Sequence, residues 1–368
     1  MLTLPSLRSS ALRSVARMPQ TFPGFCRRGR ATSSASPVPF PQLSGTSLSD
    51  ITLRQRLFGS PRSCARTILL ISITGAGGLY YVAHLERVEE SGRWRFMDMS
   101  IEAEKRFGQQ MDENVMHTHG AKILPQNHPI SIRVAKVASR IITAANLGSV
   151  KGVLPSPSLG SPVTGSVGAS AVDWEWEVYV IKEDQTANAF VTAGGKIFVF
   201  TGMLPIAGNE DGLATVLGHE IAHRVERHAA EKVSFFGAFV ALMILLDVIG
   251  LGIGTKAGVV LLMMLPNRRR AESEADTIGL RLMAQACYDP NESVHFWKRM
   301  SDLENMQEGQ NWLSWGGDFF STHPASEKRI KTLQDCMPRA LEIHAQASHA
   351  LEDRYSWFRW FRGFGLNL

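Results

Sequence analysis

Cysteine is scarce in this sequence, and a nucleotide-binding loop is missing from it. Only four cysteines occur in 368 residues, and two of them, Cys287 and Cys336, fall in the part expected to fold. Their spacing indicates no metal site, so we interpret them as ordinary thiols. Because no Gly-x-x-x-x-Gly-Lys-Ser/Thr pattern is present, no nucleotide is expected as a partner, although a separate ATP-using partner stays open.

Acidic residues are missing from the first 49 positions, where the chain has six arginines and many serines. Without this stretch, 33 basic side chains face 34 acidic ones, so the formal charge of +5 does not indicate a nucleic-acid partner. A basic, serine-rich and acid-free start is typical of a mitochondrial presequence, and an unstructured basic tail is the alternative. We therefore assign residues 1–49 to a mitochondrial presequence and a Ser- and Pro-rich linker.

Charge is also missing from the apolar run Thr67 to Ala83. At about 1.5 Å per residue this run is a slightly short but adequate membrane span, and a buried core helix is the alternative. Arginines precede the run, whereas mainly acidic residues follow it. The positive-inside rule then predicts a transmembrane helix over 67–84, a basic matrix-side segment over 50–66, and the rest of the chain in the intermembrane space.

The most informative stretch is His219-Glu220-Ile221-Ala222-His223. Residues four apart on a helix share a face, so His219 and His223 can bind one metal ion together. Glu220 then lies beside the ion, where its carboxylate can take a proton from a metal-bound water. The alternative is a helix that merely carries two solvated histidines.

A catalytic zinc needs a third protein ligand, and an acidic cluster downstream can supply it. Glu272, Glu274 and Asp276 precede a periodic apolar stretch that predicts a second helix. The residues themselves leave open whether Glu272 or Glu274 is the ligand. His228, five residues after His223, has the wrong helical phase for a ligand and is expected to support one or to lie at the surface.

These motifs resemble the HtpX/CAAX-prenyl-protease family of zinc endopeptidases. The resemblance covers His-Glu-x-x-His, the later Glu-x-x-Ala-Asp, and a Ser-x-His-Pro segment followed by Arg-Ile. It implies one Zn²⁺ per chain on His219, His223 and Glu272. It also implies that Glu220 is the catalytic base and that Asp276 lies behind the ligands, one turn after Glu272.

The same resemblance assigns three residues outside the metal helices. It implies that His323 lies near the zinc and hydrogen-bonds the developing oxyanion, although a His-Pro pair alone more often marks a turn. Arg329 is expected to anchor that loop. Asn188 and Gly195 match the family in a strand pair along the cleft, whose edge receives the substrate backbone as an added strand, and are therefore expected to contact substrate.

The rest of the chain predicts a mainly helical α+β domain over residues 90–345. By resemblance this is a zincin-like metallopeptidase domain with a small β-sheet at the cleft, joined to the N-terminal transmembrane helix. A Gly-, Ser- and Pro-rich tract over 147–172 predicts a flexible insertion. The aromatic and basic tail, 346–368, is expected to dock on a membrane surface or on the domain. Strand patterns occur at Trp174–Val180, Asn188–Thr192 and Lys196–Phe200, and helical spacing runs from Ser100 to about Asn146.

Between the two predicted metal helices lies a second apolar segment, 235–265. Both helices must stay on one side of a membrane, so this segment crosses an even number of times or not at all. Its halves, Phe235–Ile249 and Val259–Leu265, are each too short for an easy span. We therefore expect a hairpin that packs on the domain or dips into one leaflet, with a double crossing as the alternative.

The presequence and the span narrow the resemblance to the mitochondrial inner-membrane members of the family. They imply an ATP-independent endopeptidase that cleaves inner-membrane proteins under stress, including the dynamin-like fusion GTPase. Its expected partners are those substrates and the lipid bilayer, and a homo-oligomer stays open. Two alternatives remain, namely a membrane-anchored scaffold or assembly factor that keeps the fold for stability, and a zinc hydrolase of prenylated or non-peptide substrates.

Overall fold

The computed structural model describes residues 61–88, 91–153, 175–248, 253–307, 319, 322–324 and 326–363. The predicted presequence and most of the predicted insertion, 147–172, lie outside these residues. The chain divides into two units, Met1–Thr67 and Ile68–Leu368. From Ile68 onward, every element described below belongs to the second unit.

A four-stranded sheet forms the middle of the second unit, with strand order β3-β4-β6-β5. Its strands match the three predicted patterns to within a few residues and add a short fourth strand. β3 pairs in parallel with β4, β4 pairs in parallel with β6, and β5 pairs antiparallel with β6. β5 is therefore an edge strand. The strands are β3 (Ser149–Val150), β4 (Glu175–Ile181), β5 (Ala189–Val191) and β6 (Lys196–Phe200).

The two faces of the sheet bury separate apolar clusters because successive side chains of a strand point to opposite faces. Trp176, Val178 and Val180 of β4 belong to the main core, which they share with the helices α4 (Pro129–Ala144) and α6 (Glu210–Val225). Phe198 and Phe200 of β6 join a smaller cluster on the other face. Val115 of helix α3 (Ile101–His119) packs against that cluster, so helices cover both faces.

The helices begin at residues that satisfy their free backbone N–H groups. Ser100 caps α3, His128 caps α4 and Asn209 caps α6, each through a side chain that accepts a hydrogen bond from the first turn. The short helices η1 (Gly120–Lys122) and α5 (Met203–Ala207) complete the connections to the sheet.

α6 packs most extensively on α8 (Ile253–Gln285), and two glycines bring their backbones together. A Cβ on Gly218 would stand 2.9 Å from the carbonyl oxygen of Gly279, and a Cβ on Gly279 would stand 2.8 Å from the backbone nitrogen of His219. Neither site leaves room for a side chain, so this crossing requires glycine on both helices. Helices α9 (Asn291–Gln307) and α11 (Glu327–Gly363) flank the pair, and α11 includes most of the predicted tail.

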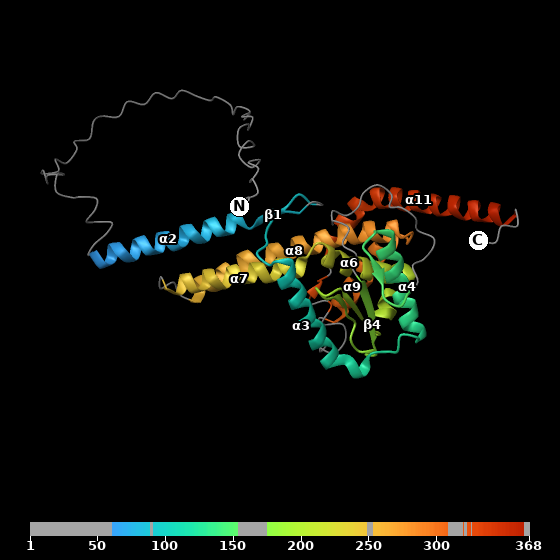
Figure 1. Ribbon diagram of the computed structural model, residues 1–368, viewed down its shortest axis with the longest axis horizontal. Helices are drawn as coiled ribbons and strands as arrows, with labels where there is room; N and C mark the ends of the chain where they lie inside the picture. The colour runs from blue at the N-terminus through green and yellow to red at the C-terminus, as the bar shows by residue number, and fades with distance from the viewer. Residues whose placement is uncertain are drawn as a thin grey trace, which may run out of the picture. The chain divides into compact units, whose positions relative to one another are not determined.

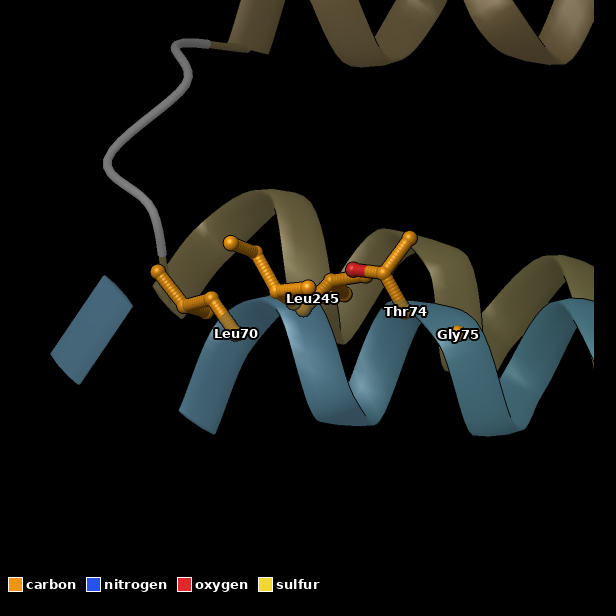
Figure 2. Close-up of a pocket in the computed structure, with 5 residues that line it drawn as sticks. Leu70, Thr74, Gly75 and Leu245 are labelled. Carbon is orange, nitrogen blue, oxygen red and sulfur yellow. The ribbon is translucent and has the colours of Figure 1, made fainter. Parts of the chain in front are cut away.

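Most of the large apolar side chains exposed among the described residues lie on two apolar helices. From Ile68 on, α2 (Pro61–Ala83) exposes large aliphatic side chains, and so does α7 (His228–Val248). Figure 2 shows Leu70, Thr74 and Gly75 of α2 beside Leu245 of α7, around a pocket that these two helices line. In Figure 1, α7 and α8 run side by side away from the sheet.

The lengths of these helices show which apolar segment could cross a membrane. Among the described residues one helix is long and apolar enough to cross a membrane, and it is α7, whereas Thr67–Ala83 is shorter. The expectation that the first half of 235–265 is too short is therefore wrong by length and composition, because α7 begins earlier, at His228. The predicted N-terminal run does form a helix as part of the 23-residue α2, and its apolar part, Thr67–Ala83, is shorter than α7.

Candidate metal centre

α6 places two imidazoles one above the other, one helical turn apart. Glu210 and Asp211 in its first turn complement the helix dipole, and the predicted motif falls in its last two turns. The Nε2 atoms of His219 and His223 stand 3.1 Å apart. Burial and two neighbouring imidazoles, His219 and His228, lower the pKa of His223 well below the usual range, so this ring is neutral and offers a lone pair.

α8 brings one of the two candidate carboxylates to the histidines. Glu272 Oε2 lies 3.4 Å from His219 Nε2, and Glu272 Oε1 lies 3.6 Å from His223 Nε2. Glu274 lies in a different cluster, where it contacts Arg93 and His228. The choice between the two glutamates that the residues alone left open therefore falls on Glu272 by geometry.

His323 reaches the same place from the chain before α11. Its Nδ1 lies 2.8 Å from Glu272 Oε2 and 3.2 Å from His219 Nε2. Its Nε2 lies 3.6 Å from Glu220 Oε1. The His323 ring therefore stands between the carboxylate of Glu272, the expected third ligand, and Glu220, the predicted base.

These donors fit a tetrahedral zinc ion. One atom from each of His219, His223, Glu272 and His323 lies within 4.8 Å of the others. Ligand atoms about 2.0–2.2 Å from a shared tetrahedral zinc stand about 3.3–3.6 Å apart, and the separations of 3.1, 3.4 and 3.6 Å among His219, His223 and Glu272 lie close to that range. Two imidazole nitrogens with a carboxylate oxygen are a zinc-type donor set, and a fourth donor or a water completes it.

Asp276 and Arg329 support the His219 side of this group. Asp276 Oδ1 lies 3.1 Å from His219 Nδ1, and Arg329 donates two 2.7 Å hydrogen bonds to the Asp276 carboxylate. The guanidinium also stacks 3.7 Å from the ring centre of Trp297 and bonds the carbonyl of Pro324. Arg329 thus holds both the carboxylate and the His323 loop, which agrees with its expected anchoring role.

The same contacts set the protonation of His219 and Asp276. Burial alone would raise the pKa of the Asp276 carboxyl, but the charge and hydrogen bonds of Arg329 bring it below its usual range. Burial alone would lower the pKa of His219, but the adjacent carboxylates of Asp276 and Glu272 raise it to about 9. Since a metal ligand must be deprotonated at the binding atom, metal binding at His219 Nε2 competes with a proton.

Glu220 is buried beside the donors, with 3% of its surface exposed. Burial raises the pKa of its carboxyl above the usual range. Among the described residues, Oε1 has no hydrogen-bond donor. A buried carboxylate with a free oxygen and a raised pKa is the arrangement that a general base needs near neutral pH.

Asn188 directly precedes β5, a strand that packs against α6, and Gly195 directly precedes β6. The Asn188 carbonyl accepts a hydrogen bond from Phe200 N. Gly195 adopts a φ of +90° in the turn before β6, a conformation that favours glycine. The turn alone accounts for this glycine, and substrate contact at either residue stays a prediction.

Sequence reasoning missed the partners that hold the ligands. Gly218 and Gly279 give no periodic or motif signal, because the sequence does not show which helices cross. Arg93 and Glu231 are separated from Glu274 by long stretches of chain, yet both belong to its cluster.

Comparison with known proteins places the chain among peptidases. The model of peptidase family M48 matches residues 159–337. The mitochondrial metalloendopeptidase OMA1 of Schizosaccharomyces pombe is 38% identical over 79% of this chain and 77% of its own length. The protein of that name from Saccharomyces cerevisiae is 33% identical over 76% of each chain. The β-barrel assembly-enhancing protease of Escherichia coli is 26% identical over 51% of this chain and 39% of its own.

Proposed function

The chain belongs to peptidase family M48 as an OMA1-type mitochondrial metalloendopeptidase, and from that premise we propose that it cleaves inner-membrane proteins at one zinc ion held by His219, His223 and Glu272. The observation that carries the proposal is the convergence of these three donors with His323, beside a buried carboxylate, Glu220. That convergence unites two helices and a loop that are far apart in the sequence.

The residues take distinct roles in peptide hydrolysis. A zinc ion held by His219, His223 and Glu272 would supply a Lewis acid that activates water and polarises the peptide carbonyl. Glu220 accepts the proton of the attacking water and then passes it to the leaving amine. His323 Nε2, on the Glu220 side of its ring, donates a hydrogen bond to the developing oxyanion.

The edge strand supports a path for the substrate. β5 pairs with β6 on one side within the described sheet, so a substrate segment in extended conformation can add antiparallel to its other side. β5 packs against α6, which carries Glu220. Asn188, directly before β5, and Gly195, in the turn between β5 and β6, are proposed to contact the substrate backbone.

We place the chain at the mitochondrial inner membrane, with the catalytic domain in the intermembrane space, and its apolar helices support contact with a membrane. α2 from Ile68 on and α7 expose large aliphatic side chains such as Leu79 and Val248, both 72% exposed. Exposed apolar surface of this extent suits contact with lipid. The substrates that we propose are inner-membrane proteins cut without ATP under stress, including the dynamin-like fusion GTPase implied by the family resemblance.

Family membership favours peptide-bond hydrolysis over the two alternatives. A scaffold or assembly factor has no use for the raised pKa and free oxygen of Glu220. A hydrolase of prenylated or non-peptide compounds would use the same metal site, so a panel of such compounds beside peptides separates it from an endopeptidase.

The test is a paired assay on the full chain in lipid nanodiscs, with zinc content and cleavage of an unfolded membrane-protein reporter measured together. Glu220→Gln should keep one zinc and lose about 10²- to 10⁴-fold in cleavage rate. Glu272→Gln should lose zinc, whereas Glu104→Gln, at a similarly buried glutamate outside the donor cluster, should keep it and is the matched control. Cleavage that persists in Glu220→Gln would contradict the assignment of the base, and unchanged zinc in Glu272→Gln would move the third-ligand role elsewhere.

A further inference from the structure

Four buried polar side chains next to the metal centre have no part in the mechanism above. They are Arg93, His228, Glu231 and Glu274, and each has a side chain that is 11% exposed or less. They come from three separate elements, because Arg93 precedes β2 (Trp94–Phe96), whereas the other three lie on α7 and α8. The group touches the metal site at one point, the ring of His223.

If His223 Nε2 binds zinc, the donor and acceptor of each hydrogen bond between His223, His228 and Glu274 are determined. A lone pair on His223 Nε2 requires its proton on Nδ1, which then donates to His228 Nδ1 at 2.8 Å. His228 must therefore carry its own proton on Nε2, from which it donates to Glu274 Oε2 at 3.2 Å. Each ring nitrogen of both histidines then has a defined role.

Glu274 can end this chain of bonds because its carboxylate is an acceptor that pairs with the guanidinium of Arg93, 2.8 Å away. Arg93 donates to both Glu274 oxygens, at 2.8 and 2.9 Å, and Ser91 donates to Oε1.

Arg93 also fixes the chain of bonds in space. It donates two further hydrogen bonds, each 2.7 Å, to the carboxylate of Glu231 on α7. Arg93 and Ser91 belong to the hairpin segment of residues 84–97, which contains β1 (Leu85–Arg87) and β2 and directly follows α2. One guanidinium thus ties this segment to α7 and α8 together.

We propose that His228 and Glu274 are positioning residues that fix the tautomer and orientation of His223, and that Arg93 makes this positioning depend on the hairpin segment. The inference rests on the proposed function in one respect, namely that His223 is a zinc ligand. Hydrogen-bond partners behind a metal ligand typically change metal affinity about 10- to 100-fold when they are removed. A cluster that served stability alone would leave zinc affinity unchanged when its bonds to His223 were lost.

The experiment measures zinc affinity of the full chain in nanodiscs by competition with a chelator, together with the visible spectrum of the cobalt-substituted protein. His228→Phe keeps the ring volume and removes both nitrogens, so zinc should bind about 10- to 100-fold more weakly and the cobalt bands should shift. Glu274→Gln keeps the shape and removes the charge, and a smaller loss in the same direction is expected. Arg93→Gln should weaken zinc binding least, because His228 and Glu274 can stay bonded.

Glu104→Gln is the matched control. Glu104 is as buried as Glu274 and pairs with Arg224 and Arg227 at 3.3 and 2.6 Å, which ties α3 to the end of α6. Its loss should lower the melting temperature without moving zinc affinity or the cobalt spectrum. When Glu104→Gln and the His228 or Glu274 variants lose the same stability, a difference in zinc affinity between them reports positioning of His223 and not folding.

Three outcomes overturn the proposal or part of it. Zinc affinity and cobalt bands that are unchanged in His228→Phe and Glu274→Gln would overturn it, provided that the wild type binds zinc and cleaves the reporter. Equal effects in Glu104→Gln would show that the cluster acts through stability alone. An unchanged affinity in Arg93→Gln, beside a weakened one in His228→Phe, would overturn the dependence on the hairpin segment. A wild type that binds no zinc would instead refute the proposed function.

Discussion

The two histidines of the metal centre stand one turn apart on α6, yet their outer nitrogens face different parts of the molecule. His219 faces Asp276 and, through it, Arg329 on α11. His223 faces His228 and, through it, Glu274 on α8. The first side is closed within the core, whereas the second ends at Arg93 in the hairpin segment. The difference indicates that one half of the site depends on the core fold and the other half also depends on a segment next to α2.

The largest effect is expected from Asp276→Asn, which removes the charge that pairs with Arg329 on the His219 side of the metal centre. The change leaves the Arg329 guanidinium buried without its bidentate partner, and breaking such a buried pair costs about 3–5 kcal/mol of unfolding free energy. Denaturant unfolding followed by tryptophan fluorescence measures it, since Arg329 stacks on Trp297. A loss below about 1 kcal/mol would show that Glu272, 3.4 Å from Arg329, compensates the charge.

Gly279→Ala should have the next largest effect, and it should disturb both the His219 side and the His223 side of the metal centre. The new methyl group would stand 2.8 Å from His219 N, so α8 must move away from α6 and carry Glu272 with it. We expect a loss of about 1–3 kcal/mol in unfolding free energy together with weaker zinc binding.

Gly237→Ala on α7 is the matched control, because a Cβ there meets no atom within 4 Å. It should be neutral or raise the unfolding free energy by up to about 1 kcal/mol, owing to the better helix propensity of alanine. Equal losses at both glycines would contradict the close crossing of α6 and α8.

Tyr179→Phe should have the smallest effect. It serves as a reference because Tyr179 contacts neither the groups behind His219 nor those behind His223. The Tyr179 hydroxyl donates to Glu177, which lowers the pKa of the Glu177 carboxyl. Burial and the same bond raise the pKa of Tyr179 to about 12. Removal of the hydroxyl should cost about 0.5–1 kcal/mol at neutral pH.

The pH dependence of this difference has a definite sign. A carboxyl whose pKa is lowered by folding stabilises the protein above its unfolded pKa, and that stability is lost as the pH falls. The difference in unfolding free energy between wild type and Tyr179→Phe should therefore be largest at neutral pH and become smaller as the pH falls. Measured unfolding curves at several pH values test this, and a gap that grows in acid would contradict it.

The sequence predicted the parts of this fold whose signals are local. Strand alternation placed β4 and β6, and the spacing of His219 and His223 placed the metal helix. The length of α7 was missed because its first turns carry charged residues such as Glu231, which bind inside the domain and interrupt the apolar run.

The sequence could not assign the contacts between distant elements. Glu272 and Glu274 are both acidic and both buried, and the direction of each side chain depends on how α8 crosses α6. Arg93 lies far from Glu274 in the chain, and no pattern around it indicates a partner. The family resemblance supplied Glu272, but it supplied neither His228 nor Arg93 with a role.

The contact of Gly218 with Gly279 has a consequence for how this site can change. Because backbone touches backbone there, α8 cannot shift by a single residue along α6 without driving a side chain such as that of Leu280 or Ile278 into the gap. The next arrangement that restores comparable packing is about one turn away, roughly 5.4 Å, which would take Glu272 out of reach of both histidines. A slide of α8 along α6 would therefore take the ligand set from assembled to dismantled in a single step, so such a slide cannot tune the peptidase gradually.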